Sequence, residues 1–139
     1  MTRSHRPLAL QSMTLSALLA SVVSASADCN DTPGPGLDGS GCMKISKVLA
    51  GYDLHGANFV RADLTRSNFK GANLEGADFT KANLTRAILR GANLKGATLA
   101  GASATRAYLD SADLRKANLR KIDLNRVDLS ETDLSDALL

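Results

Sequence analysis

The chain has 139 residues and a net charge of +3, with 44% hydrophobic residues but only 4% aromatic residues. One domain is expected at this length, and 22% charged residues is too ordinary for a disordered tail or a basic protein that coats nucleic acid. Two histidines and two cysteines leave few side chains for nucleophilic, acid–base or metal chemistry. The composition therefore disfavours catalysis.

Residues 1–27 predict a cleaved secretory signal peptide. Two arginines precede a mostly apolar stretch, and small residues at Ala25–Ala27 match a signal-peptidase cleavage pattern. Polar residues interrupt the apolar stretch, so a retained membrane span is the weaker alternative, because a span needs about 20 predominantly apolar residues. Lipid attachment at Cys29 is a third alternative, disfavoured because Asp28 stands directly before that cysteine. We expect the mature chain to begin at Asp28, in the periplasm or outside the cell.

Export changes what the two cysteines indicate. Cys29 and Cys42 enclose twelve residues with a Pro-Gly-Pro-Gly run, and in an oxidising compartment a disulfide between them is the first expectation. A metal site is the first alternative, but the nearby aspartates lack the ordered spacing of a calcium loop. A redox pair is the second, although such cysteines usually stand two residues apart. We therefore expect residues 28–50 to form a disulfide-closed N-terminal loop and cap.

From residue 51 onward the sequence repeats with a period of five. Large apolar residues stand at every fifth position from Leu54 to Leu139 with one exception, Ala104, and alanine usually stands two positions earlier. On an α-helix, five residues advance by about 500°, so the apolar positions would spread over every face. On a strand, an odd period sends successive large residues to opposite faces. The remaining solution is a chain that turns a corner once per unit.

The recurrent A-[DN]-[LF]-x-x pattern of residues 52–139 resembles the pentapeptide-repeat family. The resemblance implies an all-β fold, a right-handed four-sided β-helix with four pentads, or twenty residues, per coil. Residues 51–139 would then form the β-helix. The 88 residues of the pattern make about 4.4 coils, or about 20 Å at about 4.8 Å per stacked strand.

Stacking by twenty residues predicts one column of large side chains on each side of the β-helix. We expect Phe59 above Phe79 to form a stacked core pair. The four sides, in chain order, are the first (Leu54, Leu74, Leu94, Leu114, Leu134), the second (Phe59, Phe79, Leu99, Leu119, Leu139), the third (Leu64, Leu84, Ala104, Leu124) and the fourth (Phe69, Leu89, Leu109, Leu129).

One region departs from the repeat. Ala104 stands between Leu84 and Leu124 in the third column and leaves out most of a leucine side chain, so Ala104→Leu is expected to raise thermal stability. Nearby, four positions carry other residues where Asn or Asp is usual, namely Ile88, Thr98, Ser103 and Tyr108. Asn and Asp side chains bond the local backbone at corners, so we expect the wall between Arg90 and Tyr108 to be the loosest.

The candidate binding site is a row of arginines after the third side. Arg66, Arg86, Arg106 and Arg126 recur at intervals of one coil, and Arg61, Lys81 and Lys121 stand at the same slot one side earlier. The simpler interpretation is a solvated face, partly neutralised by Asp63 and Asp123, that also limits aggregation. The sharper hypothesis is an anion-binding ladder for lipid headgroups, glycan phosphates or an acidic protein.

No catalytic or cofactor site is expected. His55 is the only histidine after residue 27, and no nucleophile arrangement or phosphate-binding loop accompanies it. We expect a non-catalytic structural or interaction module with no cofactor and no metal, whose partner is an unknown protein or an anionic envelope component. We expect neither a nucleic-acid partner nor a membrane span in the mature chain. A homodimer through the C-terminal coil is possible, and the resemblance leaves one alternative, a DNA-mimicking, gyrase-binding protein.

Overall fold

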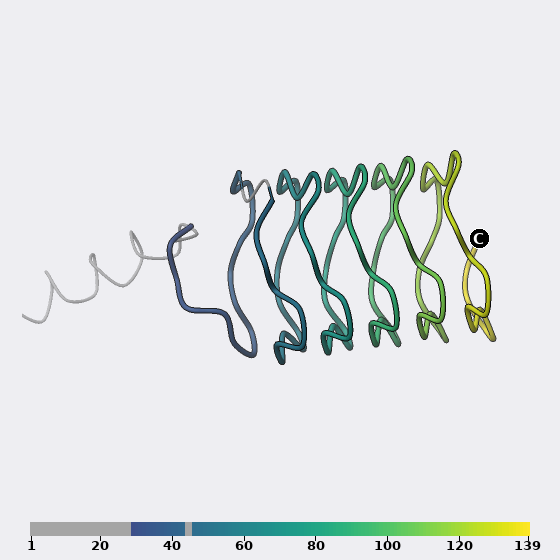
Figure 1. The fold of residues 1–139 in the computed structure, drawn as a ribbon, viewed down its shortest axis with the longest axis horizontal. Helices are drawn as coiled ribbons and strands as arrows, with labels where there is room; N and C mark the ends of the chain where they lie inside the picture. Colours follow the sequence, from purple (N-terminus) through teal and green to yellow (C-terminus); the bar gives the residue numbers. More distant parts are fainter. Residues whose placement is uncertain (1–28, 44–45) are drawn as a thin grey trace, which may run out of the picture.

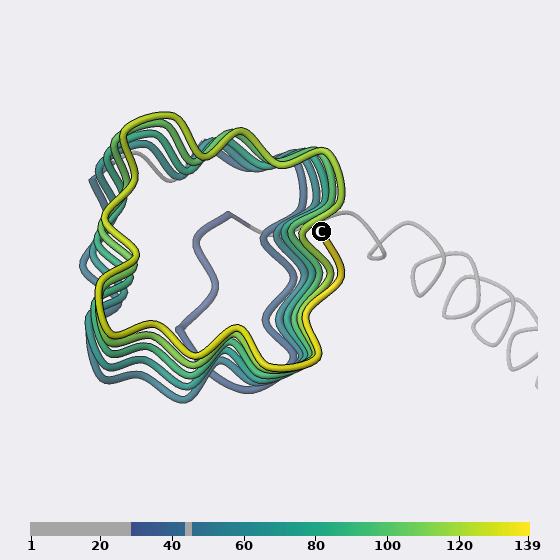
Figure 2. The same cartoon turned by 90° about the vertical axis from the view of Figure 1, so that its right-hand side faces the viewer.

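The computed structural model describes residues 29–43 and 46–139, so the predicted signal peptide, residues 1–27, lies outside the described residues. The described chain forms a rod of stacked coils (Figure 1), and each coil is four-sided when seen along the rod (Figure 2). Single bridging residues alternate with turns throughout this part of the chain, which contains neither a helix nor a multi-residue strand. None of its segments is a helix long and apolar enough to cross a membrane.

The coils stack with the expected register of twenty residues. Every β-bridge is parallel and joins residues twenty apart, from Asp38↔Asn58 to Asn118↔Leu138. In the backbone ladder, the Leu54 N–H donates to the Asn73 carbonyl at 2.7 Å. Because each coil supplies partners for the backbone groups of the next, the right-handed β-helix satisfies its main chain without long strands.

One left-handed residue per pentad makes each corner. Positive φ occurs at every fifth residue from Gly36 to Asp136, at nine glycines and twelve other residues. At a representative corner the Ala57 N–H donates to the Leu54 carbonyl at 3.0 Å, and Gly56, third in the turn, has φ +66°. This is the geometry of a type II turn, which requires positive φ at its third residue.

Large and small side chains alternate in the core as predicted. The large columns are fully buried through the middle coils, and alanine fills the slot two residues earlier. The Phe59 and Phe79 rings stack with centroids 5.2 Å apart and planes inclined by 22°, which confirms the predicted pair. Phe69 comes from the fourth side and meets the Phe59 ring edge-on at 5.8 Å, so three aromatic rings share the first coils.

The β-helix begins earlier than the sequence predicts. Bridges already form at Asp38, Met43 and Val48, so residues 38–50 belong to the first coil rather than to a separate cap. Residues 37–139 number 103, which makes about five coils of twenty instead of 4.4. The physical reason is that the pentad phase continues backward: Leu37 and Cys42 occupy the small-residue slot and are buried.

The disulfide holds the remaining N-terminal segment against this coil. Cys29 and Cys42 are bonded, with Cα atoms 5.5 Å apart, which confirms the predicted pair. Residues 29–35 precede the first corner residue, Gly36, whose N–H bonds the His55 carbonyl at 2.9 Å, and they cross the N-terminal end of the coil (Figures 1 and 2). The bond therefore ties this end segment to a side chain that is itself part of the core.

The backbone ladder is continuous through the wall between Arg90 and Tyr108, which the sequence predicts to be the loosest. The Leu89 N–H donates to the Tyr108 carbonyl at 2.7 Å, and the Ala104 N–H donates to the Asp123 carbonyl at 2.8 Å. Longer backbone bonds occur in the first and last coils, where Tyr52 N–H to Leu49 O is 3.4 Å. The backbone ladder does not depend on Asn or Asp side chains, whereas an end coil packs against a neighbouring coil on one side only.

Candidate functional site

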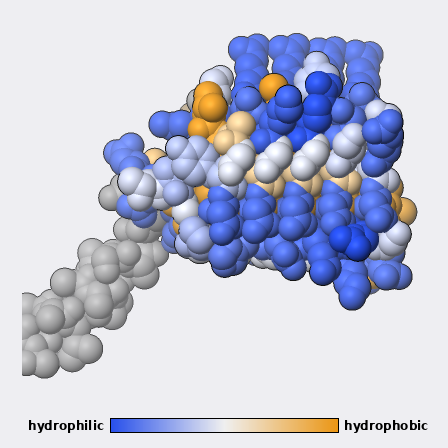
Figure 3. Space-filling model, turned by 60° about the horizontal axis from the view of Figure 1, so that its bottom comes forward, coloured by the Kyte–Doolittle hydropathy of each residue, from blue (hydrophilic) through white to orange (hydrophobic). Residues whose placement is uncertain are grey.

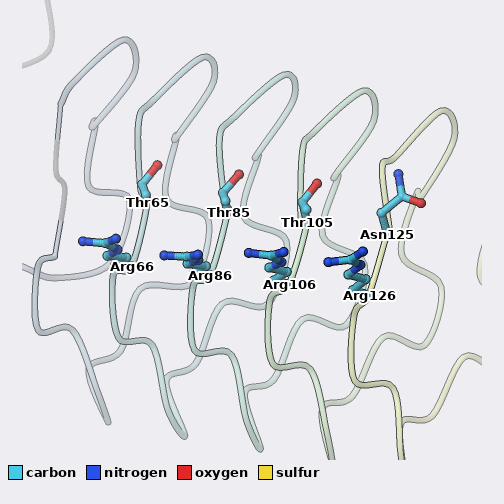
Figure 4. A pocket seen from close by; sticks show the side chains of 8 residues that line it. All are labelled: Thr65, Arg66, Thr85, Arg86, Thr105, Arg106, Asn125 and Arg126. Atoms are coloured by element: carbon cyan, nitrogen blue, oxygen red, sulfur yellow. The ribbon is translucent and has the colours of Figure 1, made fainter.

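The four predicted arginines form a straight ladder at the corner between the third and fourth sides (Figure 4). Arg66, Arg86, Arg106 and Arg126 each occupy the left-handed corner position, with φ between 57° and 59°, and each is exposed. Because equal backbone conformations repeat at one coil spacing of about 4.8 Å, the side chains leave the rod in parallel. We call these four residues the arginine ladder.

A second row of polar side chains runs beside the arginine ladder and forms a trough with it. One hydroxyl or amide residue precedes each arginine, in the order Thr65, Thr85, Thr105 and Asn125 (Figure 4). These four residues and the arginine ladder line a hollow of about 450 Å³. Each of the four coils therefore contributes one arginine and one small polar residue to the trough.

The arginine ladder has no carboxylate partner in the described chain. Asp63, which the sequence analysis treats as a partial neutraliser, accepts hydrogen bonds from the Thr65 backbone N–H at 3.1 Å and from its hydroxyl at 2.6 Å. Asp123 accepts from the Asn125 N–H and the Thr105 hydroxyl, both at 3.0 Å, and these bonds lower the pKa of Asp123. The Arg–Asp ion pairs within residues 29–43 and 46–139 involve other groups: Arg90 with Asp110, and Arg115 with Asp113 and Asp133.

The arginine ladder is unusual among the four corners. Glycine holds at least two left-handed positions at each of the other three corners, and none at this one. A left-handed residue with a side chain costs about 1–2 kcal/mol, which glycine avoids. This corner therefore carries side chains where backbone stability alone favours glycine.

A second basic row follows the neighbouring corner, between the second and third sides. Arg61 and Lys81 line a smaller hollow of about 410 Å³, and Lys121 stands at the same slot two coils after Lys81. Gly101 interrupts this row, so only the arginine ladder is continuous over four coils. Since side chains repeat by coil, residues of like hydropathy form rows along the rod (Figure 3).

The histidine site has simple surface geometry. His55 Nδ1 lies 2.9 Å from Asp53 Oδ1, and both side chains are 55% exposed. The hydrogen bond from His55 lowers the pKa of Asp53. In the part of the chain that the structure describes, no three His, Cys, Asp or Glu side chains are grouped to hold a metal ion.

The repeats of this chain match a known protein family. The family model described as "Pentapeptide repeats" matches the sequence with eight copies, over residues 49–86, 77–115, 87–126 and 107–139. The chain belongs to the pentapeptide-repeat family. The match does not point to a family of enzymes. No protein of curated function matches the sequence.

Solved pentapeptide-repeat structures share the fold. A pentapeptide repeat protein from the Arabidopsis thaliana thylakoid lumen is 32% identical over 73% of this chain and 70% of its own, with a TM-score of 0.71. The cyanobacterial protein Rfr23 from Cyanothece 51142 is 32% identical over 66% of this chain and 63% of its own, with a TM-score of 0.64. The protein alr5209 from Nostoc PCC 7120 is 28% identical over 85% and 93%, with a TM-score of 0.54.

The sequence located the arginine ladder but missed its backbone conformation. Glycines such as Gly56 and Gly76 adopt the same positive φ at other corners. The missed signal was that Arg66 and its equivalents stand in the same pentad slot as those glycines. The sequence also gave no indication that the threonine hydroxyls are bonded to Asp63 and Asp123.

Proposed function

We propose that this pentapeptide-repeat protein is an exported, non-catalytic binding module that docks on an anionic partner in the cell envelope through the arginine ladder. The observation that carries the proposal is the row of four parallel guanidinium groups, none of which is paired with a carboxylate in the described chain. Support for export comes from the signal-like sequence of residues 1–27 and from the disulfide, which persists in oxidising compartments.

Electrostatics favours an anion along this row. Two positive charges about 5 Å apart repel by about 1 kcal/mol in water, and the rigid coils prevent the arginines from spreading along the axis. A bound anion replaces this repulsion by attraction. The planar guanidinium fork also matches the two oxygens of a carboxylate or phosphate group.

Substitution of the four arginines tests the proposal. Arg66, Arg86, Arg106 and Arg126 are changed together to glutamine, which keeps a long polar side chain at each left-handed corner. The matched control removes four charges elsewhere, by Lys→Gln at Lys47, Lys70, Lys95 and Lys116. We expect the parent and control to bind heparin or anionic vesicles in a salt-sensitive way, and the ladder variant to lose this binding. Equal, salt-insensitive behaviour of all three proteins would show a merely solvated face.

The second candidate is a gyrase-binding protein that imitates DNA. Its support is a group of acidic side chains in the last coil: Asp123, Asp128, Glu131, Asp133 and Asp136. A DNA mimic needs an acidic surface along the rod, whereas two adjacent corners here carry seven basic residues. A gyrase supercoiling assay separates the two candidates, because protection of gyrase at stoichiometric protein would reverse their order.

The last coil offers a surface for a second copy of the chain. Leu134, Leu138 and Leu139 are 36%, 48% and 82% exposed. Exposed apolar side chains at an open coil edge favour pairing through that edge. We expect a dimer in size-exclusion chromatography with light scattering, and a strict monomer at high concentration would contradict it.

A further inference from the structure

We propose that the ligand of the arginine ladder is a linear acidic polysaccharide, built of uronic acid sugars, that lies lengthwise in the trough with about one sugar per coil. This inference rests on the proposed function and specifies its ligand. It follows from three properties of the trough: its shape, the hydrogen-bonding state of its threonines and the spacing of its rungs.

The shape of the site favours a chain over a flat surface. The trough is lined by pairs of neighbouring residues from four successive coils, so it runs along the rod axis (Figure 4). A hollow of about 450 Å³ is within the range of small-molecule sites, but here it is long and open at the surface. A linear polymer can enter such a trough, whereas a planar array of lipid headgroups would touch only the arginine tips.

The threonine hydroxyls determine which chemistry suits the trough. A hydroxyl has one proton to donate, and Thr65 and Thr105 donate theirs to Asp63 and Asp123, at 2.6 Å and 3.0 Å. Toward a ligand these two hydroxyl oxygens can therefore only accept. The arginines, in contrast, can only donate. A ligand that bonds both the arginines and these threonine oxygens therefore bears anionic groups and hydrogen-bond donors along its length.

A chain of uronic acid sugars has both kinds of group on every unit. Its carboxylates accept from the arginine ladder, and its hydroxyl groups donate to the threonine oxygens. Polyphosphate supplies only acceptors at neutral pH, so it leaves the hydroxyl oxygens of Thr65 and Thr105 without a donor.

The length of the arginine ladder sets the size of the ligand. Each pyranose ring advances a linked sugar chain by a distance close to one coil spacing, so four rungs correspond to about four sugars. Ser46 occupies the corner slot before Arg66 and carries no charge. The charged row therefore begins abruptly at Arg66. Sugar chains longer than about four units gain no further contact with the arginine ladder.

Calorimetry with galacturonate oligomers of one to eight sugars tests the proposal on the purified full-length protein. We expect affinity to rise steeply up to about four sugars and then to level off. The double variant Thr65→Val/Thr105→Val removes two acceptor oxygens with little change in shape. It should weaken tetragalacturonate binding about tenfold and leave polyphosphate binding unchanged. The matched control is Ser130→Ala, which removes the same type of bond, from Ser130 Oγ to Asp128 at 2.7 Å, outside the trough.

The outcomes separate this proposal from the proposed function. Tight binding of polyphosphate or phosphatidylglycerol vesicles that requires the arginine ladder, with no dependence on sugar-chain length or on the two threonines, would overturn the polysaccharide and keep the anion-docking module. Single-stranded RNA bound more tightly than every oligosaccharide would also overturn it. Failure of every polyanion to distinguish the four-arginine variant from the parent would overturn both.

Discussion

Filling the gap at Ala104 should stabilise the rod. Ala104 is fully buried between Leu84 and Leu124 in the third column, which also contains Leu64. The coil spacing is regular at this position, because the hydrogen bond from the Ala104 N–H to the next coil is 2.8 Å long and the equivalent bonds at Leu64 and Leu84 are 2.8 and 2.7 Å. Ala104→Leu therefore adds apolar atoms to a column built for them.

The magnitude follows from the three carbon atoms added. At about 0.8 kcal/mol per buried carbon, the transfer gain is about 2.4 kcal/mol. Loss of leucine rotamer freedom takes back about 0.5–1 kcal/mol, which leaves about 1.5 kcal/mol. For a β-helix of 103 residues this corresponds to a rise in Tm of about 6–12 °C.

Thermal and urea unfolding followed by circular dichroism measure the effect. Ala82→Leu is the matched control: Ala82 is also buried, but it stands in the small-residue slot, where added volume should overpack the core and destabilise by about 1–3 kcal/mol. A lower Tm for Ala104→Leu, with the far-UV spectrum unchanged, would refute the reasoning and show that neighbouring side chains already occupy the space.

Three further predictions concern the disulfide, acid and the corners. Cys29→Ser, or reduction of the parent, should lower stability by about 3 kcal/mol through loss of loop closure, measured as a Tm difference with and without reductant; no difference would contradict it. Asp113, whose pKa is lowered first by its hydrogen bond from Arg115, and Asp123, lowered by the Asn125 N–H, favour the folded state above the unfolded pKa of about 3.9. Stability should therefore fall as the pH drops below about 4, whereas pH-independent unfolding between pH 5 and pH 2 would exclude this linkage. Arg86→Gly should raise stability by about 1 kcal/mol by relieving a left-handed side chain while weakening anion binding, and a loss of both would show that Arg86 is structural.

Most of the fold could be predicted because the five-residue period determines both the corners and the stacking of the coils. The five-residue pattern requires a corner per unit, and the twenty-residue register then places Phe59 on Phe79. The start of the coil was missed because Gly39 and Lys44 stand in the large-residue slot and hide the phase. Backbone pairing tolerates such residues, since it needs register rather than a particular side chain.

The candidate site was predictable in position but not in chemistry. Periodicity alone aligns the arginine ladder, because positions twenty apart must stack. The hydrogen-bond partner of each carboxylate depends on the side-chain rotamers at the turn. The repeat pattern does not encode these rotamers. Asp63 and Asp123 therefore looked like neutralising charges, while their hydrogen bonds from Thr65 and Thr105 instead leave the arginine ladder unpaired.

The most direct test of the account is NMR observation of the arginine side chains during titration with tetragalacturonate. The Nε–Hε signals of Arg66, Arg86, Arg106 and Arg126 should shift together and saturate at one equivalent. Arg90 and Arg115, which are paired with aspartates, serve as internal references and should stay in place. Signals of the arginine ladder that do not move, or equal shifts at all arginines, would contradict the claim that this corner binds a chain of uronic acid sugars.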